Sequence, residues 1–360
     1  MGSPLVSVIV PTFNRAYCLP RTIDSILRQT HRNLEVIVVD DGSSDQTRDL
    51  VQRSYGVDRR VKYYHQDNQG ANAARNQGIR LSKGEYVALL DSDDTWMPWK
   101  LQLQLACMER FPEVGMVWTD MEALGADGAV LSTSYLRTMY DAYRWFSNDQ
   151  LFSCVCPLTG IVPELHSVTE GRTLAIGDIF SQMVMGNLVH TSTVVVKRQR
   201  LEKVRGFNEE LQPSGGDYDF HLRTCREGPV GFVDIATIRY QTGMPDRLSR
   251  ESTTLSRATN CLRTILPVLE QDRARIRLSL AMIHSRLAEV HDWIGETALD
   301  LGLMSEARRH LLASLRHDPL QPRALRMLAL SFLPFRLGLS ARKLFRMLRP
   351  RLRTARAGAR

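Results

Sequence analysis

The chain is poor in cysteine and lacks the patterns in which cysteine usually acts. Its 360 residues include six cysteines, and no two of them form a C-x-x-C pair. Cys154 and Cys156 are set too close together for a usual zinc site. We therefore expect reduced, mostly packed thiols in a reducing compartment.

Long apolar runs are also absent. No uninterrupted run approaches 18 residues, so we expect no membrane-spanning helix. The first residues enter a strand-like run at once, without the charged and apolar regions of a signal peptide, and we expect none. The nine histidines show no metal-ligand spacing along the sequence. A hydrophobic content of 43% and a charged content of 24% are ordinary for a soluble globular protein.

Acidic residues are missing from the C-terminal segment. After Asp318 there are eleven bases and no acid, and removing these bases from the total of 47 leaves 36 against 39 acids. The net charge of +8 therefore lies in one segment, which argues against a general nucleic-acid binder and favours contact with an anionic surface. Phe332 to Leu352 mixes apolar and basic residues and predicts an amphipathic segment suited to a membrane surface. The alternatives are a solvated tail or one that docks on the chain's own acidic body.

Strands and helices alternate in the first part of the chain. The apolar runs at 5–10, 34–39 and 86–90 have strand length, and the residues at 19–29 and 68–82 have helical spacing. This order predicts an α/β fold with a mostly parallel central sheet flanked by helices. Residues 123–180 read as an insertion that shapes one wall of a pocket. From about Leu255 the pattern is all-helical.

These changes predict three parts: a catalytic domain at 1–250, a helical extension at 251–335 and a basic amphipathic tail at 336–360. The extension contains one helix pair, Glu296 to Leu315 and Arg323 to Leu333, that is similar to a tetratricopeptide unit. One unit is too few for such an array, so an ordinary helical hairpin is the favoured reading.

Polar clusters follow three of the predicted strands: 12–15, 40–41 and 91–93. Parallel strands bring these clusters to one edge of the sheet, where ligands bind in open α/β folds. The stretch from Gly84 to Asp94 ends in three carboxylates, which are costly to bury unless a cation compensates them. A divalent ion that also carries substrate phosphate is the simplest candidate. The alternative is an acidic turn in which Asp94 or Thr95 caps a helix at 97–110.

Six blocks of sequence carry a family resemblance. They are SVIVPTFNR (7–15), LEVIVVDDGSSDQT (34–47), NQGANAARNQGI (68–79), GEYVALLDSDD (84–94), VRGFNEEL (204–211) and GGDYDFHLR (215–223). In this order they resemble a family 2 glycosyltransferase of the GT-A fold, a Rossmann-like α/β fold, here with a C-terminal all-helical extension. The resemblance implies inverting transfer of a sugar from a nucleotide diphosphate. It also implies a divalent metal, Mn²⁺ or Mg²⁺, at the family's DxD element, which in this sequence is Asp91-Ser92-Asp93.

The resemblance also implies roles for individual residues. The metal ligands are Asp93 and Asp91, with Asp91 on the ribose side, and the catalytic base is Asp217. The remaining substrate-binding residues are Pro11, Thr12 and Arg15 beside the nucleotide, Asp40 on its base, Asn72 and Arg75 towards the base and diphosphate, and Ser92 within the DxD element.

Two departures from the family pattern concern the acceptor side. Position 216 is Gly where Glu is usual, which we interpret as a change in acceptor contacts. The segment 240–249 lacks the expected His, and Arg247 is a candidate diphosphate contact instead.

His190 is expected to be packed and hydrogen-bonded rather than catalytic.

The sequence thus predicts a metal-dependent glycosyltransferase that moves a sugar, with a UDP-sugar favoured as donor, to a hydroxyl of a lipid-linked saccharide in bacterial surface glycan synthesis. We expect a cytoplasmic enzyme held peripherally at the inner face of the membrane. A non-catalytic membrane scaffold is an alternative. A sugar nucleotidyltransferase is another, although these enzymes normally carry a glycine- and basic-rich N-terminal loop, which VPTFNR is not.

Overall fold

The computed structural model describes residues 2–244 and 251–333. Arg247 and the predicted basic tail at 336–360 lie outside the described residues, as does the predicted boundary at residue 250. The chain divides into two compact units, the first formed by Met1–Arg250 with Thr264–Arg277 and the second by Glu251–Arg263 with Leu278–Arg360. No helix in the described ranges is long and apolar enough to cross a membrane.

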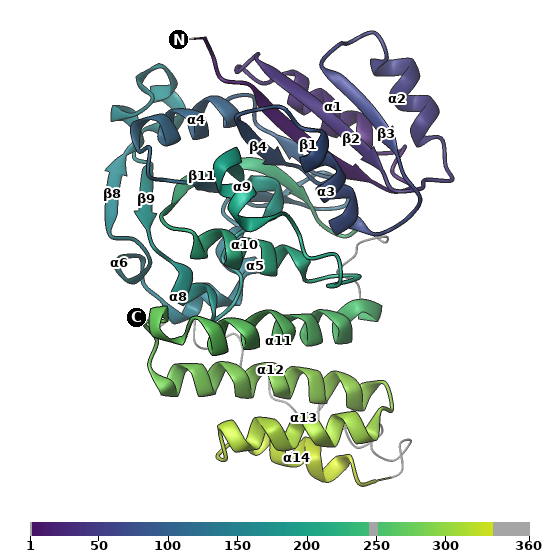
Figure 1. Ribbon diagram of the computed structural model, residues 1–360, viewed down its shortest axis with the longest axis vertical. Helices are drawn as coiled ribbons and strands as arrows, with labels where there is room; N and C mark the ends of the chain where they lie inside the picture. The colour runs from purple at the N-terminus through teal and green to yellow at the C-terminus, as the bar shows by residue number, and fades with distance from the viewer. Residues whose placement is uncertain (1, 245–250, 334–360) are drawn as a thin grey trace. The chain divides into compact units, whose positions relative to one another are not determined.

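The first unit is built on one mixed sheet (Figure 1). Its main path has the order β3-β2-β1-β4-β10-β6-β11-β9-β8, and β5 and β7 pair with β11 and β6. Parallel pairing joins β3, β2, β1 and β4, and also β6 and β11; the other pairs are antiparallel. The strands are β1 (Val6–Thr12), β2 (Leu34–Asp40), β3 (Val61–His65), β4 (Tyr86–Leu89), β5 (Thr95–Trp96), β6 (Met116–Leu124), β7 (Val130–Ser132), β8 (Cys154–Pro157), β9 (Thr173–Gly177), β10 (Val195–Lys197) and β11 (Val230–Gln241).

Helices flank this sheet, and α3, α9 and α10 lie in front of it in Figure 1. The predicted α/β fold with flanking helices and C-terminal helices is confirmed. The sequence predicts a mostly parallel sheet; the sheet is parallel from β3 to β4 and between β6 and β11, and mixed as a whole in the described residues. The helices of the first part of the chain are α1 (Leu19–Leu27), α2 (Thr47–Tyr55), α3 (Ala71–Leu81), α4 (Lys100–Arg110), α5 (Leu136–Met139), α6 (Asn148–Leu151), α7 (His166–Thr169), α8 (Phe180–Met183), α9 (Arg198–Val204) and α10 (Gly216–Arg226).

Close packing of α3 on the central strands fixes the position of its polar face. Every residue of β1 and β2 is buried, as expected for strands covered on both sides. A Cβ added at Gly78 of α3 would lie 2.3 Å from Ile9 Cγ2, so only glycine allows this approach. The small residues Ala73 and Ala74 are buried beside it. The approach brings the N-terminal half of α3 close to the ends of β1 and β4.

The segment 123–180 adds two strands to one end of the sheet, β8 and β9, and several short helices. The apolar, β-branched stretch at 189–196 is mostly irregular: a 3-10 turn, η4 (Thr191–Thr193), comes first, and only Val195–Lys197 pairs as β10. The β-branched run predicts an extended backbone, but the turn delivers the side chains of His190 and Ser192 to the site described below.

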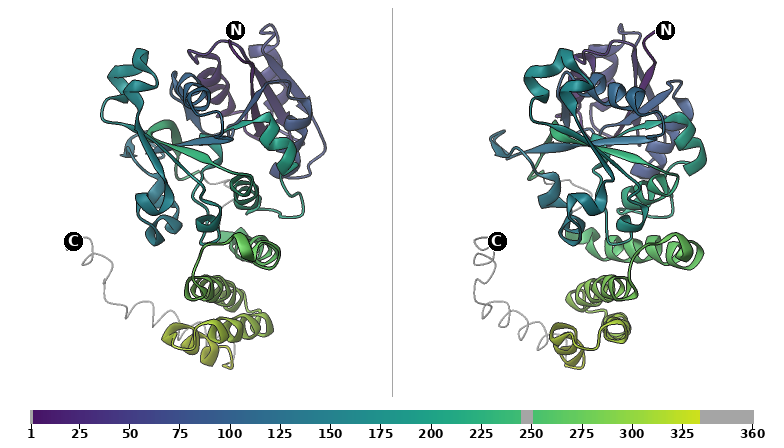
Figure 2. Two further views of the ribbon diagram at one scale, coloured as in Figure 1. Left: turned by 60° about the vertical axis from the view of Figure 1, so that its left-hand side comes forward. Right: turned by 90° about the vertical axis from the view of Figure 1, so that its left-hand side faces the viewer.

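The second unit is helical and its helices stack side by side (Figure 2). The helices are α11 (Thr254–Gln271), which straddles the division, α12 (Leu280–Asp300), α13 (Met304–His317) and α14 (Pro322–Leu330). The single helix predicted from Glu296 to Leu315 is wrong. Gly302 adopts a φ of 78° and ends α12, because glycine accepts this left-handed conformation without a side-chain clash.

Candidate functional site

The three strand ends that carry polar clusters are neighbours in the sheet. β1 lies between β2 and β4, and all three run parallel. Thr12 is in register with Asp40, and the backbone N–H of Leu90 donates to Ile9 O one residue before Asp91. The predicted convergence of the clusters on one edge is therefore present in the fold.

Asp91 is paired with an arginine from α3. Arg75 is buried, and its Nη2 lies 2.7 Å from Asp91 Oδ1. The backbone N–H of Asp91 donates to Ser192 Oγ. Burial would raise the pKa of Asp91, but the charge and hydrogen bond of Arg75 outweigh burial and lower it. Asp91 is thus an ionised carboxylate at neutral pH.

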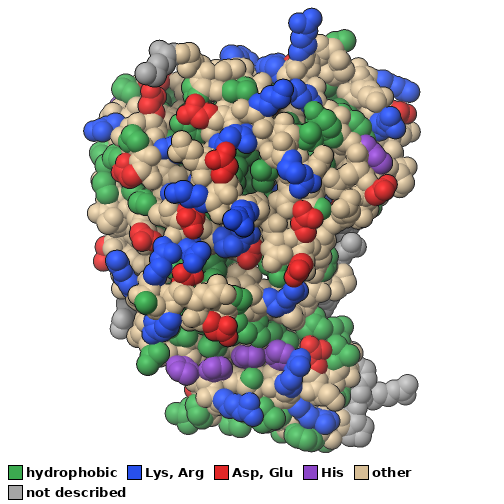
Figure 3. Space-filling model, viewed as in Figure 1, with side chains coloured by type: hydrophobic (Ala, Val, Ile, Leu, Met, Phe, Trp, Pro, Cys, Tyr) green, Lys and Arg blue, Asp and Glu red, His purple; other side chains and the backbone are tan. Residues whose placement is uncertain are grey.

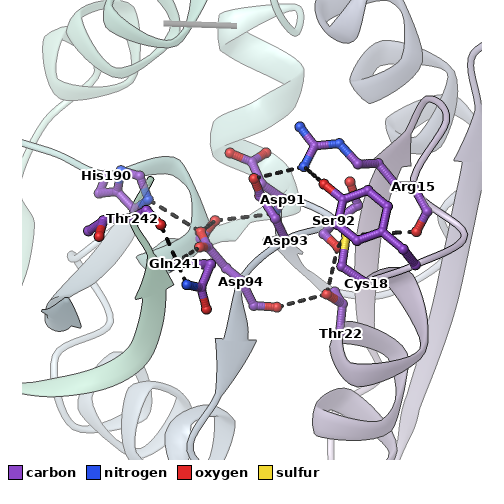
Figure 4. Close-up of polar contacts among 12 residues, drawn as sticks. Arg15, Cys18, Thr22, Asp91, Ser92, Asp93, Asp94, His190, Gln241 and Thr242 are labelled. Carbon is purple, nitrogen blue, oxygen red and sulfur yellow. Dashed lines mark hydrogen bonds and ion pairs between the residues drawn. The ribbon is translucent and has the colours of Figure 1, made fainter. Parts of the chain in front are cut away.

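Asp93 is paired with an arginine from the loop after β1 (Figure 4). Arg15 Nη1 lies 3.1 Å from Asp93 Oδ2. Burial and the charges of Asp94 and Asp91 nevertheless raise the pKa of Asp93 to about 6. A raised carboxyl pKa among like charges reports an excess of negative charge, which a bound cation would relieve.

Asp91 and Asp93 suit a hard divalent cation, which prefers carboxylate oxygens. Within the described residues, no group of three or more His, Cys, Asp or Glu side chains is arranged to hold a metal ion. Two carboxylates completed by substrate phosphates are a common way to bind Mg²⁺. The two carboxylates therefore fit an ion whose remaining ligands come from a phosphate substrate, rather than an ion held by protein ligands alone.

Asp94 belongs to the interior and not to the next helix. It is buried, and its Oδ2 accepts a hydrogen bond from Ser192 Oγ at 2.6 Å and lies 3.5 Å from His190 Nε2. The prediction that Asp94 caps the following helix is wrong. Strand β5 follows Asp94 directly, and α4 begins only at Lys100.

His190 and Tyr140 extend the acidic cluster towards α10. His190 is buried, as expected, and its Nδ1 lies 3.1 Å from Tyr140 Oη. Burial would lower the pKa of His190, but Asp94, Asp91 and Asp217 together raise it. Burial raises the pKa of Tyr140 well above its ordinary value, and Asp217 adds to this shift. The charge of Asp217 thus acts on the same cluster as Asp91.

Thr12 Oγ1, Arg75 Nε and His190 Nε2 are among the buried polar atoms of the described structure that have no hydrogen-bond partner. Buried polar groups are nearly always paired, so such atoms point to a ligand.

Pro11 is buried within β1. Ser92 is buried as well, and its backbone carbonyl accepts a hydrogen bond from Thr22 Oγ1 at 2.9 Å. The segment after β4 is therefore tied to α1.

Asp40 is fully buried, and its carboxylate accepts hydrogen bonds from the backbone N–H of Ser43 and from Tyr63 Oη. Asn72 is also turned inward, and its Nδ2 donates to the backbone carbonyls of Asn208 and Leu211. Both side chains organise loops around the edge. Their predicted contacts with a nucleotide stay predictions.

Because Gly216 has no side chain, the side chain of Asn72 can pack directly against its backbone. A Cβ at position 216 would lie 2.1 Å from Asn72 Nδ2. Asp217, the next residue, is half-buried in the first turn of α10. Asp219 forms an ion pair with Arg223 one turn later in the same helix. Of the two acids, Asp217 is therefore the better placed for chemistry.

The Glycosyl transferase family 2 model matches residues 7–149. The putative teichuronic acid biosynthesis glycosyltransferase TuaG of Bacillus subtilis is 42% identical over 130 residues, which are 36% of this chain and 51% of that protein. An uncharacterized glycosyltransferase of Rickettsia felis is 44% identical over 238 residues, which are 66% of this chain and 34% of that protein. The uncharacterized glycosyltransferase RT0329 of Rickettsia typhi is 33% identical over 64% of this chain and 61% of its own length. Each alignment spans less than two thirds of the relative.

Two solved structures share the fold. S. aureus TarS 1–349, crystallised with UDP-GlcNAc, has a TM-score of 0.53 at 17% identity and covers 94% of this chain and 91% of its own. The mannosyltransferase PcManGT from Pyrobaculum calidifontis, in complex with GDP-Man and Mn²⁺, has a TM-score of 0.51 at 18% identity and covers 95% and 87%. At these identities the likeness concerns the fold alone.

Proposed function

Residues 7–149 belong to glycosyl transferase family 2, and from this premise we propose that the protein transfers a sugar from a nucleotide diphosphate donor to an acceptor hydroxyl, with inversion. The observation that carries the proposal is the pairing of two arginines with two carboxylates at one sheet edge. Arg15 and Arg75 supply positive charge there, and Asp91 and Asp93 supply hard oxygen ligands.

The arginines suit the leaving group of this reaction. Cleavage of the bond between sugar C1 and the diphosphate leaves negative charge on the departing oxygen. Guanidinium groups form strong, charge-assisted hydrogen bonds with phosphate oxygens. Arg75 carries an unpartnered Nε beside the edge, and Thr12 Oγ1 offers a second unpartnered group. Both fit a donor diphosphate lying along the ends of β1 and β4.

Asp93 and Asp91 are the residues that would hold the metal, Mn²⁺ or Mg²⁺. When bound, such an ion neutralises charge on the diphosphate. The fit of two carboxylates completed by phosphate supports this part of the proposal, as does the Mn²⁺ bound by PcManGT.

Asp217 is the proposed base. It accepts the proton of the acceptor hydroxyl while the acceptor oxygen bonds to C1 and the bond from C1 to the diphosphate breaks. Attack from the face opposite the leaving group inverts the configuration at C1. The electrostatic influence of Asp217 on His190 and Tyr140 supports a position close to the cluster that contains Asp91.

For the donor we propose a UDP-sugar, because TarS, which shares the fold, was crystallised with UDP-GlcNAc. The proposed acceptor is a lipid-linked saccharide at the cytoplasmic face of the membrane, reached through the basic C-terminal segment. The name of TuaG, which links that relative to teichuronic acid biosynthesis, supports a surface-glycan role.

A donor screen tests the proposal. The full chain is incubated with UDP-, GDP- and dTDP-sugars, each with Mn²⁺, with Mg²⁺ or with EDTA, and released nucleotide is measured. We expect metal-dependent release from at least one donor, with UDP-sugars strongest. No release from any donor in the presence of metal and a saccharide acceptor would contradict the proposal.

A further inference from the structure

Four of the nine histidines form a row on the helical unit (Figure 3). His284 and His291 lie seven residues apart on α12, and His310 and His317 lie seven residues apart on α13. Seven residues are close to two helical turns, so each pair shares one face of its helix. No single segment of sequence contains the row, which forms only when the two helices pack together.

Ring contacts join the four side chains in the order His284, His317, His291, His310. His284 Nδ1 lies 3.1 Å from His317 Nδ1, and His291 Nδ1 lies 2.9 Å from His310 Nδ1. The His291 and His317 rings are nearly parallel, with centroids 5.8 Å apart. The row thus consists of two pairs. We call His284 with His317 the outer pair, because it is the more exposed, and His291 with His310 the inner pair, because it is the more buried.

The two pairs differ in their surroundings. Arg309 Nη2 lies 3.2 Å from Nε2 of His310, which places a permanent positive charge beside the inner pair and occupies that ring nitrogen. His310 is also buried. In the outer pair His284 is exposed and His317 half-buried, so solvent and ions can reach it.

The geometry points to a metal site, and we propose that His284 and His317 bind one divalent transition-metal ion of the Zn²⁺, Ni²⁺ and Cu²⁺ class. Two nitrogens, each about 2.0–2.1 Å from one ion at angles between about 90° and 109°, lie about 2.9–3.4 Å apart, which includes the separation of the outer pair. Imidazole suits these ions, whereas Mg²⁺ and Mn²⁺ prefer oxygen ligands.

The site has two protein ligands, since the described residues offer no group of three or more suitable side chains. Water completes the coordination shell. The ion would join α12 to α13, so its binding should also stabilise the helical unit. This inference is independent of the proposed transfer reaction, because its ligands and metal class differ from those of the strand-end carboxylates.

The test is calorimetric titration of the untagged full chain with Zn²⁺ and Ni²⁺ at pH 7.5. The variant Asp93→Asn serves as background, so that the strand-end carboxylates are weakened as a competing site. We expect one ion per chain, and we expect H284Q and H317Q each to weaken binding by more than about tenfold, the scale that even second-shell changes reach. His291→Gln is the matched control on the same face of α12, and it should retain the affinity.

A second readout guards against misfolded variants. Zn²⁺ should raise the midpoint of thermal unfolding of the background protein but not that of H284Q, while Mg²⁺ should raise neither. Unchanged affinity in both H284Q and H317Q would overturn the proposal. Loss of binding in His291→Gln with retention in H284Q would also overturn it, because the inner pair would then be the site.

Discussion

Arg15 and Asp93 form an ion pair that joins the ends of two neighbouring strands. The guanidinium follows β1, the carboxylate follows β4, and Nη1 lies 3.1 Å from Oδ2. Both side chains are largely buried, so neither charge is freely hydrated. The proposed reaction needs the carboxylate for a metal and the guanidinium for a diphosphate. In the proposed reaction, donor binding would replace this contact between two protein groups with a contact from Arg15 to the diphosphate and from Asp93 to the metal.

Arg15→Gln should weaken donor binding. The variant removes a charge-assisted contact with the diphosphate, typically about 1.5–3 kcal/mol, which corresponds to roughly a ten- to hundredfold rise in the donor KM. Arg28→Gln is the matched control, since Arg28 forms an exposed ion pair with Asp24 on α1. Steady-state kinetics with varied donor measure both variants. Equal donor KM values in the two variants would contradict the role given to Arg15.

Gly216→Ala should destabilise the fold and lower transfer. The added methyl group would lie 2.1 Å from Asn72 Nδ2 and displace an amide that donates to Asn208 and Leu211. Overpacking of this kind costs about 1–3 kcal/mol. Gly160→Ala is the control, because a Cβ there meets nothing within 4 Å.

The double variant Gly216→Ala with Asn72→Ala separates the clash from the loss of the amide. It should regain part of the unfolding free energy lost in Gly216→Ala, because the colliding side chain is gone. Chemical denaturation measures the four proteins of this cycle. Strictly additive losses would show that the two positions do not interact.

Glu35 should make stability depend on acid pH. It is buried in β2 and accepts hydrogen bonds from Ser7 Oγ, Lys62 Nζ and the backbone N–H of Lys83. Burial would raise the pKa of Glu35, but these donors outweigh it and hold the pKa below its ordinary value of 4.5. The folded state therefore binds this proton less readily than the unfolded state, and the stabilisation is lost as pH falls through the folded pKa.

Glu35→Gln should lower the free energy of unfolding at pH 7 by about 1–3 kcal/mol, since the amide leaves Lys62 without a counter-charge. The difference from the unmodified protein should shrink below pH 4.5. Glu113→Gln, at an exposed position, is the control. Urea denaturation at pH 7 and at pH 3.5–4.5 gives the comparison, and a difference that does not change with pH would contradict the assignment.

Hydrophobic patterning predicted β1, β2 and β4, because fully buried parallel strands have continuous apolar sequences. It also predicted that the polar residues after these strands would meet at one edge. It could not predict that Asp94 turns into the interior. That orientation depends on Ser192 and His190, which are nearly one hundred positions away and lie in a turn that the pattern did not reveal.

Tyr140 was missed for a related reason. It lies in a segment of short helices without periodicity, and its contact with His190 is a tertiary one. The break between α12 and α13 was missed because apolar spacing continues through Gly302, whose left-handed backbone is not visible in the pattern.

The basic C-terminal segment should carry membrane binding. The full chain should float with vesicles that contain anionic lipid, and a truncation after Leu333 should not, because each base near an anionic surface contributes about 1 kcal/mol. Vesicles of neutral lipid are the control. Equal flotation of the two proteins with anionic vesicles would contradict the proposal that the C-terminal segment binds the membrane.

The most direct test of the proposed function is sugar transfer by Asp93→Asn and Asp217→Asn, with Asp219→Asn as a matched control in α10. Transfer of labelled sugar is measured with the donor and metal selected by the screen, after circular dichroism has established that each variant is folded. We expect Asp217→Asn to lose transfer by more than about a hundredfold, the lower end of the range for loss of one general base. We expect Asp93→Asn to lose transfer as well, because it removes a carboxylate proposed to hold the metal. Asp219→Asn should remain active. Near-normal transfer by either Asp93→Asn or Asp217→Asn would contradict the account.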